Sequence, residues 1–132
     1  MGAVVGAQVY LWGMDVIRVR ALLTFPGHGE PGVEHDSVAV GPQGLAGDRP
    51  KKAAVSLVGD DSPTTRANLV LDAPTTRVEQ LDGSVLRVGE VVLAVHRTGT
   101  SCPGLYAAVG EPGRLVVGDV VQVVDQESED LA

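Results

Sequence analysis

Short apolar runs, most of them rich in valine, recur along the chain and are separated by turn-forming residues. Several runs alternate apolar and polar side chains, which is typical of short β-strands with one buried face. We predict strands at Val16–Leu23, Val38–Val40, Ala53–Val58, Asn68–Leu71, Val85–Val88, Val91–Val95, Tyr106–Val109, Leu115–Val117 and Val120–Val124. The segment Phe25–His35 is rich in proline and glycine and is predicted to be a loop.

One short helix is predicted, at about Arg77–Leu81. Thr76 and Glu79 have the spacing of a capping box, in which both side chains satisfy backbone N–H groups at the start of a helix. A chain of short strands with at most one or two short helices does not fit a doubly wound α/β fold, because parallel strands there need crossover helices. The pattern therefore predicts a mainly β fold, a small closed or nearly closed β-barrel that hides its strand edges.

Two stretches of the sequence resemble each other. Leu86–Val92 and Leu115–Val121 each place a glycine and an acidic residue between two apolar runs. We favour two similar hairpins over an internal duplication, because glycine followed by an acid is a common turn. Glu90 and Asp119 are then turn residues and not catalytic acids.

Length and composition limit the class of protein. The 132 residues suit a single domain, which we place at 14–124, between an N-terminal extension at 1–13 and an acidic tail at 125–132. The start of the sequence has no basic region of the kind that signal peptides carry, and no apolar run reaches a membrane-spanning length, so we expect a cytoplasmic protein without a membrane partner. A net charge of −7 argues against a nucleic-acid partner, because such partners need a positive field.

The single cysteine, Cys102, is the first candidate for chemistry. It excludes an internal disulfide and fits a reducing compartment. It lies in a loop of Gly, Thr, Ser and Pro and not in an apolar run, and His96 and Arg97 upstream are placed to favour the reactive thiolate. Two interpretations stay open, a functional thiol and an incidental loop cysteine.

The stretch Gly44–Arg49 is the second candidate. Arg49 offers a planar fork of donors for a phosphate or carboxylate, and Lys51 and Lys52 follow closely, which suggests a local anion site. The alternative is a turn in which Asp48 caps backbone amides and pairs with Arg49. The three histidines match no metal motif, although His28, His96 and Cys102 could meet in space.

The order of these pieces resembles the MOSC domain, the C-terminal domain of eukaryotic molybdenum cofactor sulfurase, which also occurs alone in bacteria. The resemblance runs from about Val16 to Val124. It rests on the ordered motifs Gly44–Arg49 ("GLxGDR"), Ala67–Leu69, Leu86–Leu93, Ser101–Pro103, Gly104–Val109 and Val117–Val121.

The resemblance implies a small MOSC-like β-barrel and a cysteine that carries sulfur as a persulfide, or that coordinates molybdenum in members that bind the cofactor. Cys102 would then be the sulfur carrier or the metal ligand. Arg49 and Asn68 would lie near the anionic pterin phosphate or shape the pocket, and Lys51 and His96 are assigned to the same cofactor-binding region. A persulfide is a reversible sulfur store, and a soft thiolate suits a soft metal centre.

The sequence also departs from the MOSC pattern. Gly59–Ala67 is too short for the helix that such domains usually have there, and Cys102 runs almost directly into Gly104. Ala67 stands where an acid is common, and the opening loop has His28 in place of the usual lysine. This pared-down pocket weakens the prediction of cofactor binding more than that of sulfur carriage.

We therefore predict a sulfur carrier that receives sulfur from a donor such as a cysteine desulfurase and delivers it to the molybdenum cofactor or another acceptor. The first alternative is a molybdenum-cofactor-binding reductase module for N-hydroxylated compounds. The second is a barrel recruited as a small-molecule lyase or as a binding module. Pyridoxal phosphate is not predicted, because neither Lys51 nor Lys52 lies in a recognisable site for it.

Overall fold

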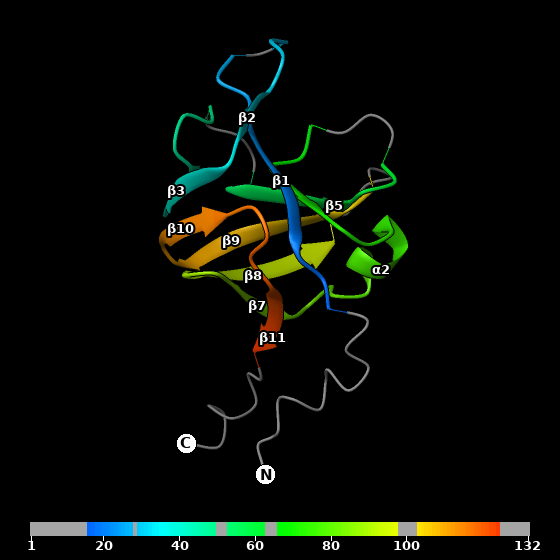
Figure 1. Ribbon diagram of the computed structural model, residues 1–132. Coiled ribbons are helices and arrows are strands. Elements are labelled where there is room, and N and C mark those ends of the chain that lie inside the picture. Colours follow the sequence, from blue (N-terminus) through cyan, green and yellow to red (C-terminus); the bar gives the residue numbers. More distant parts are fainter. Residues whose placement is uncertain (1–15, 28, 50–52, 63–65, 98–102, 125–132) are drawn as a thin grey trace.

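The computed structural model describes residues 16–27, 29–49, 53–62, 66–97 and 103–124, and within these ranges strands predominate (Figure 1). The elements are β1 (Val19–Thr24), β2 (Val33–His35), β3 (Ser37–Gly41), β4 (Gly44–Leu45), β5 (Val55–Gly59), β6 (Leu69–Leu71), α2 (Thr75–Glu79), β7 (Val85–Val88), β8 (Val91–Arg97), β9 (Leu105–Glu111), β10 (Gly113–Val116) and β11 (Val121–Val124). The mainly β class predicted from the alternating apolar pattern is confirmed. No helix in these ranges is long and apolar enough to cross a membrane.

The strands form one large curled sheet and one small sheet (Figure 1). The large sheet has eight strands in the order β11-β7-β8-β9-β5-β6-β1-β2, and the small one has three in the order β10-β3-β4. All strand pairs are antiparallel except β5 and β6.

The large sheet is so strongly curled that the start of β1 contacts the residues that lead into β11. The Val19 N–H donates to the Asp119 carbonyl at 2.9 Å, and the Val121 N–H donates to the Ile17 carbonyl at 2.8 Å. Arg18 and Val120 form the bridge between these bonds. These contacts close much of the open edge that a flat sheet would expose.

Leucine and valine side chains fill the interior of the curl. In β8 the buried residues Val91, Leu93 and Val95 alternate with the more exposed Val92, Ala94 and His96, as the two-residue repeat of a strand requires. Among the largest fully buried side chains all are leucine or valine. The scarcity of aromatic residues therefore reflects a core built from aliphatic side chains.

The segment predicted to be one loop, Phe25–His35, contains a strand. Residues Val33–His35 form β2 and pair antiparallel with the end of β1, with Leu22 opposite His35 and Thr24 opposite Val33. The loop prediction is therefore wrong over these three residues. The proline and glycine residues mark only the turn between the two strands, and the return strand is too short to show a two-residue pattern.

The prediction of two similar hairpins holds for one of the two stretches. β7 and β8 form a hairpin, with Val88 opposite Val91. β10 and β11 do not pair with each other, because β10 pairs with β3 and β11 pairs with β7. The second stretch therefore connects the small sheet to the large sheet. The two stretches have similar sequences because both form a tight turn.

The helix lies two residues earlier than predicted, and the capping box is wrong. Its N-cap is Pro74, which has no side-chain cap hydrogen bond. Asp61, from the turn after β5, accepts a hydrogen bond from the Thr75 N–H at 2.9 Å instead. The Thr75 hydroxyl donates to the same carboxylate at 2.8 Å and accepts from the Gly59 N–H at 3.0 Å, which ties α2 to β5.

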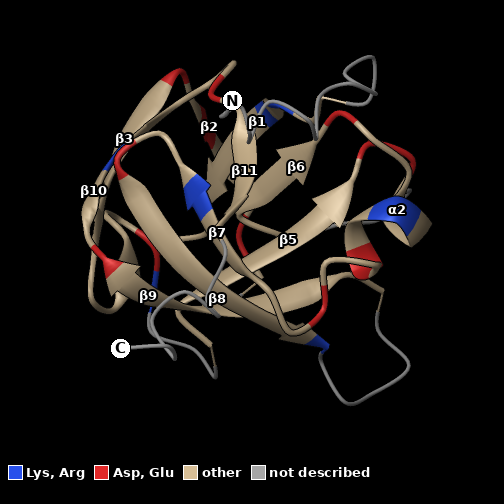
Figure 2. Ribbon diagram, turned by 90° about the horizontal axis from the view of Figure 1, so that it is seen from below, with Lys and Arg blue, Asp and Glu red and all other residues tan. Residues whose placement is uncertain are grey.

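Acidic side chains serve the backbone in the same way throughout the described fold. In each case a carboxylate oxygen accepts a hydrogen bond from a backbone N–H group. The N–H group belongs to another turn or strand, or, for Asp119, to a residue three positions earlier. The pairs are Asp48 with Phe25, Asp61 with Thr75, Asp72 with Arg18, Glu79 with Gly104, Asp82 with Arg97, Glu90 with Arg114 and Asp119 with Val116. Acidic positions accordingly lie mostly in loops and at strand ends (Figure 2). Glu90 and Asp119 are turn residues, as predicted.

We expect the Asp61 contact to make stability depend on pH. The hydrogen bonds from the Thr75 backbone and hydroxyl hold the pKa of the Asp61 carboxyl below its ordinary value. Because the folded-state pKa is the lower one, the carboxylate stabilises the fold above the unfolded-state pKa, and this contribution is lost as pH falls through the folded-state pKa. Urea unfolding of wild type and Asp61→Ala should differ most near neutral pH and converge in acid. Asp60→Ala is the matched control, and a pH-independent difference for Asp61→Ala would contradict this role.

Candidate functional site

The predicted sulfur-carrying residue, Cys102, lies outside the described residues, and so do Lys51, Lys52 and His28. What the structure describes is the frame on either side of Cys102. The chain leaves β8 at Arg97 and enters β9 at Leu105, and these two residues are opposite each other in the β8–β9 pair. The cysteine therefore belongs to the connection between two paired strands.

Two carboxylates hold the ends of this connection. Asp82, in the turn after α2, accepts a hydrogen bond from the Arg97 N–H at 2.9 Å. Glu79, at the end of α2, accepts one from the Gly104 N–H at 2.8 Å. The helix and its following turn thus fix the points where the Cys102 segment departs and returns.

Gly104 also needs to be glycine. Its φ is +94°, a left-handed conformation that side chains rarely adopt. A Cβ there would collide with the carbonyl oxygen of Leu57 on β5. The end of the Cys102 segment is therefore packed against the sheet backbone, and this close approach adds to the Glu79 hydrogen bond.

Asn68 is fully buried, with a relative exposure of 0%, and its side chain joins three segments. Its Oδ1 accepts from the Ser56 N–H at 3.1 Å and the Ser56 hydroxyl at 3.4 Å. Its Nδ2 donates to the Leu23 carbonyl at 3.1 Å and to the Asp48 carboxylate at 3.2 Å. The amide thus reaches β5, β1 and the turn after β4, which gives Asn68 a positioning role; its predicted contact with a cofactor stays a prediction.

The Gly44–Arg49 stretch contains the capping turn that was the alternative to an anion site. Asp48 accepts a hydrogen bond from the Phe25 N–H at 2.8 Å, and the Arg49 N–H donates to the Phe25 carbonyl at 3.2 Å. Gly47 has a φ of +91°, so the turn depends on a glycine there. The half-buried Arg49 guanidinium makes no hydrogen bond or ion pair with the residues that the structure describes. The Asp48 cap uses no atom of the Arg49 guanidinium, so the anion site stays a prediction.

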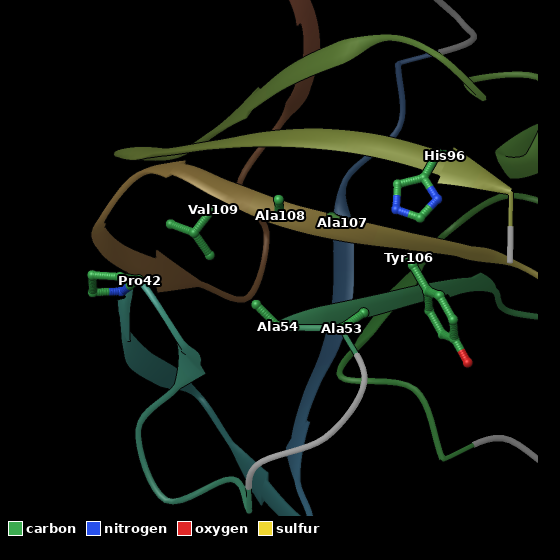
Figure 3. Close-up of a pocket in the computed structure, with 8 residues that line it drawn as sticks. All are labelled: Pro42, Ala53, Ala54, His96, Tyr106, Ala107, Ala108 and Val109. Carbon is green, nitrogen blue, oxygen red and sulfur yellow. The ribbon is translucent and has the colours of Figure 1, made fainter.

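A pocket of about 380 Å³ lies along β9, between the end of β8 and the segment that leads into β5 (Figure 3). Among the residues that the structure describes, it is lined by Pro42, Ala53, Ala54, His96, Tyr106, Ala107, Ala108 and Val109. Of the predicted site residues, His96 lines this pocket, whereas Arg49 and Asn68 do not. Within the described ranges, no three His, Asp or Glu side chains are grouped to hold a metal ion.

Tyr106 and Ser56 were not among the predicted site residues. Tyr106 lies opposite His96 in the β8–β9 pair and opposite Ser56 in the β5–β9 pair. The His96 and Tyr106 rings are edge to face, with centroids 6.3 Å apart and an interplanar angle of 79°. A polar row therefore runs from His96 through Tyr106 and Ser56 to Asn68. Cross-strand register creates this row, and local sequence patterns do not show which residues lie opposite one another.

The sequence matches no protein-family model and shows no significant similarity to a curated protein. The structure does resemble solved proteins. The YuaD protein from Bacillus subtilis matches with a TM-score of 0.63 and 14% identity, over 82% of this chain and 95% of that one. The chain has the same fold as YuaD.

Two further structures extend this comparison. A hypothetical protein matches with a TM-score of 0.63 and 15% identity, over 86% of this chain and 71% of that one. YiiM from Escherichia coli matches with a TM-score of 0.57 and 16% identity, over 83% of this chain and 70% of that one. Identities this low show a shared fold and leave the function to be argued from the site.

We expect Asn68→Ala to destabilise the protein by about 3 kcal/mol, because it leaves several buried hydrogen-bonding groups of Ser56, Leu23 and Asp48 without their partner. Ser56→Ala, which keeps the amide in place, should cost about 1 kcal/mol. Urea unfolding of both variants measures the difference. Equal losses for the two would show that the Asn68 side chain does not join these segments.

Proposed function

We propose that this chain is a compact MOSC-type sulfur carrier in which Cys102 accepts sulfur as a persulfide and passes it to the molybdenum cofactor or another acceptor. Two independent lines support the family. The sequence motifs occur in the MOSC order, and the fold is that of YuaD and YiiM, which are MOSC-domain proteins. Sulfur carriage is the further step, and it rests on the surroundings of the single cysteine.

The observation that carries this step is the pair of carboxylate contacts at the ends of the β8–β9 connection. A carrier has to present one thiol to a donor and then to an acceptor, which favours a short segment with fixed ends. Asp82 and Glu79 supply those fixed ends through the Arg97 and Gly104 N–H groups.

The chemistry requires no external oxidant. The Cys102 thiolate attacks the outer sulfur of a persulfide on the donor, such as a cysteine desulfurase. The donor's sulfur–sulfur bond breaks as the new one forms, and the donor leaves as its own thiolate. The outer sulfur of the resulting Cys102 persulfide is then available to an acceptor, and this second transfer restores the Cys102 thiolate.

Intact mass after incubation with a cysteine desulfurase and free cysteine tests this proposal. Wild type should gain the mass of one sulfur atom, and a reductant should remove it. Cys102→Ala should gain nothing and keep the wild-type unfolding midpoint, since it removes only the thiol. A thiol that stays free and alkylatable after the incubation would overturn sulfur carriage.

An anionic molybdenum cofactor is the alternative that one observation favours. The Arg49 guanidinium, which has no hydrogen bond or ion pair among the described residues, is the kind of group that binds a phosphate. The described residues hold no metal-binding cluster, so a molybdenum ion would depend on the Cys102 thiolate, and redox chemistry on N-hydroxylated compounds would come from the bound metal. Metal analysis after expression in a host that makes the cofactor distinguishes this reductase role. A protein lacking both molybdenum and sulfur uptake would point to a recruited lyase or binding barrel.

A further inference from the structure

We propose that the pocket along β9 binds a flat, largely apolar small molecule that carries one neutral hydrogen-bond donor, a hydroxyl or a ring N–H. The binding needs no thiol chemistry, although His96, which lines the pocket, is also the residue predicted to favour the Cys102 thiolate. The Cys102→Ala variant therefore tests the pocket separately from sulfur transfer.

The lining sets the shape and polarity of the ligand. Six of the eight lining residues are alanine, proline or valine, and the volume of about 380 Å³ lies in the usual range for small-molecule pockets. Ala53, Ala54 and Ala108 line the pocket with short side chains, which suits a planar ring system, whereas the Ala107 side chain is buried in the core. The Tyr106 ring stands at one end and adds an aromatic wall (Figure 3).

His96 determines where the donor of the ligand lies. Its Nδ1 is 2.9 Å from the Arg97 carbonyl oxygen, and because a carbonyl only accepts, Nδ1 carries the proton. In the neutral ring Nε2 is then a hydrogen-bond acceptor. Figure 3 shows the second ring nitrogen on the side of the alanines, so it faces the space that a ligand would fill.

The same lining disfavours a charged ligand. None of the eight lining residues is Asp, Glu, Lys or Arg. Among these described lining residues, a charged group would lose hydration without gaining an opposite charge. These residues are best matched by a ligand that donates one hydrogen bond to His96 Nε2 and is otherwise apolar.

Indole and 1-methylindole form a matched pair of probes, because they differ in the ring N–H. We expect wild type to bind indole about fivefold more tightly, the value of one ordinary hydrogen bond. The binding is followed by NMR of protein with ¹³C-labelled alanine methyl groups. The largest shifts should fall on the methyl groups of Ala53, Ala54 and Ala108, while the core residue Ala107 should shift less.

Three variants test the assignment. His96→Phe keeps an aromatic ring but cannot accept a hydrogen bond, so the preference for indole should disappear. Ala108→Leu fills the pocket and should abolish binding of both probes. Ala39→Leu, on an exposed strand position of β3 outside the pocket, is the matched control and should bind as wild type does.

The possible results separate cleanly. The proposal would be overturned by equal affinity of wild type for the two probes, by shifts centred outside the pocket, or by no shifts at all. If Ala108→Leu does not fold, the His96→Phe variant still tests the proposal. Cys102→Ala should keep the indole preference. Loss of sulfur uptake with retained indole binding would separate the two sites, and loss of indole binding alone would leave sulfur carriage untouched.

Discussion

The described fold depends on carboxylates that accept hydrogen bonds from backbone N–H groups. Strands of two to seven residues leave many backbone groups at their ends, and a buried or half-buried group without a partner is costly. Seven acidic side chains supply such partners, and most of them join segments far apart in the sequence. The net charge of −7 thus includes groups with a structural task, in addition to the acids of the tail.

The candidate site is built from the same interaction. Asp48 holds the turn that carries Arg49, and the buried Asn68 amide ties Asp48 to β5 and β1. Glu79 and Asp82 hold the two ends of the segment that contains Cys102. One kind of contact therefore holds both the Gly44–Arg49 turn and the two ends of the β8–β9 connection.

The sequence was informative where a residue's role is local. The two-residue alternation of valine located most of the strands, and the Gly-acid pairs identified turns, as Glu90 and Asp119 show. It was misleading where the partner is distant. Glu79 has the spacing of a capping box but bonds to Gly104, and β11 follows a hairpin-like turn but pairs with β7.

The site shows the same division. Cys102 and Arg49 were found from their local sequence, a Gly/Thr/Ser/Pro loop and the Gly44–Arg49 motif, and their functional roles stay predictions. The burial of Asn68, the frame around the Cys102 segment and the His96–Tyr106 pair all arise from strand register, which local patterns do not encode. Tyr106 was predicted as the start of a strand and as part of the Gly104–Val109 motif but not as a site residue, because nothing in the nearby sequence places it beside His96.

The central claim is that α2 holds the Cys102 segment in place for sulfur transfer, and the single-turnover rate of sulfur transfer to Cys102 measures this most directly. Glu79→Ala removes the acceptor for the Gly104 N–H, whereas Glu79→Gln keeps an oxygen that can accept it. We predict a rate lower by on the order of tenfold for Glu79→Ala, with most of the rate restored in Glu79→Gln, at unchanged total sulfur uptake. Equal rates for wild type and both variants would contradict the claim that this carboxylate positions the cysteine.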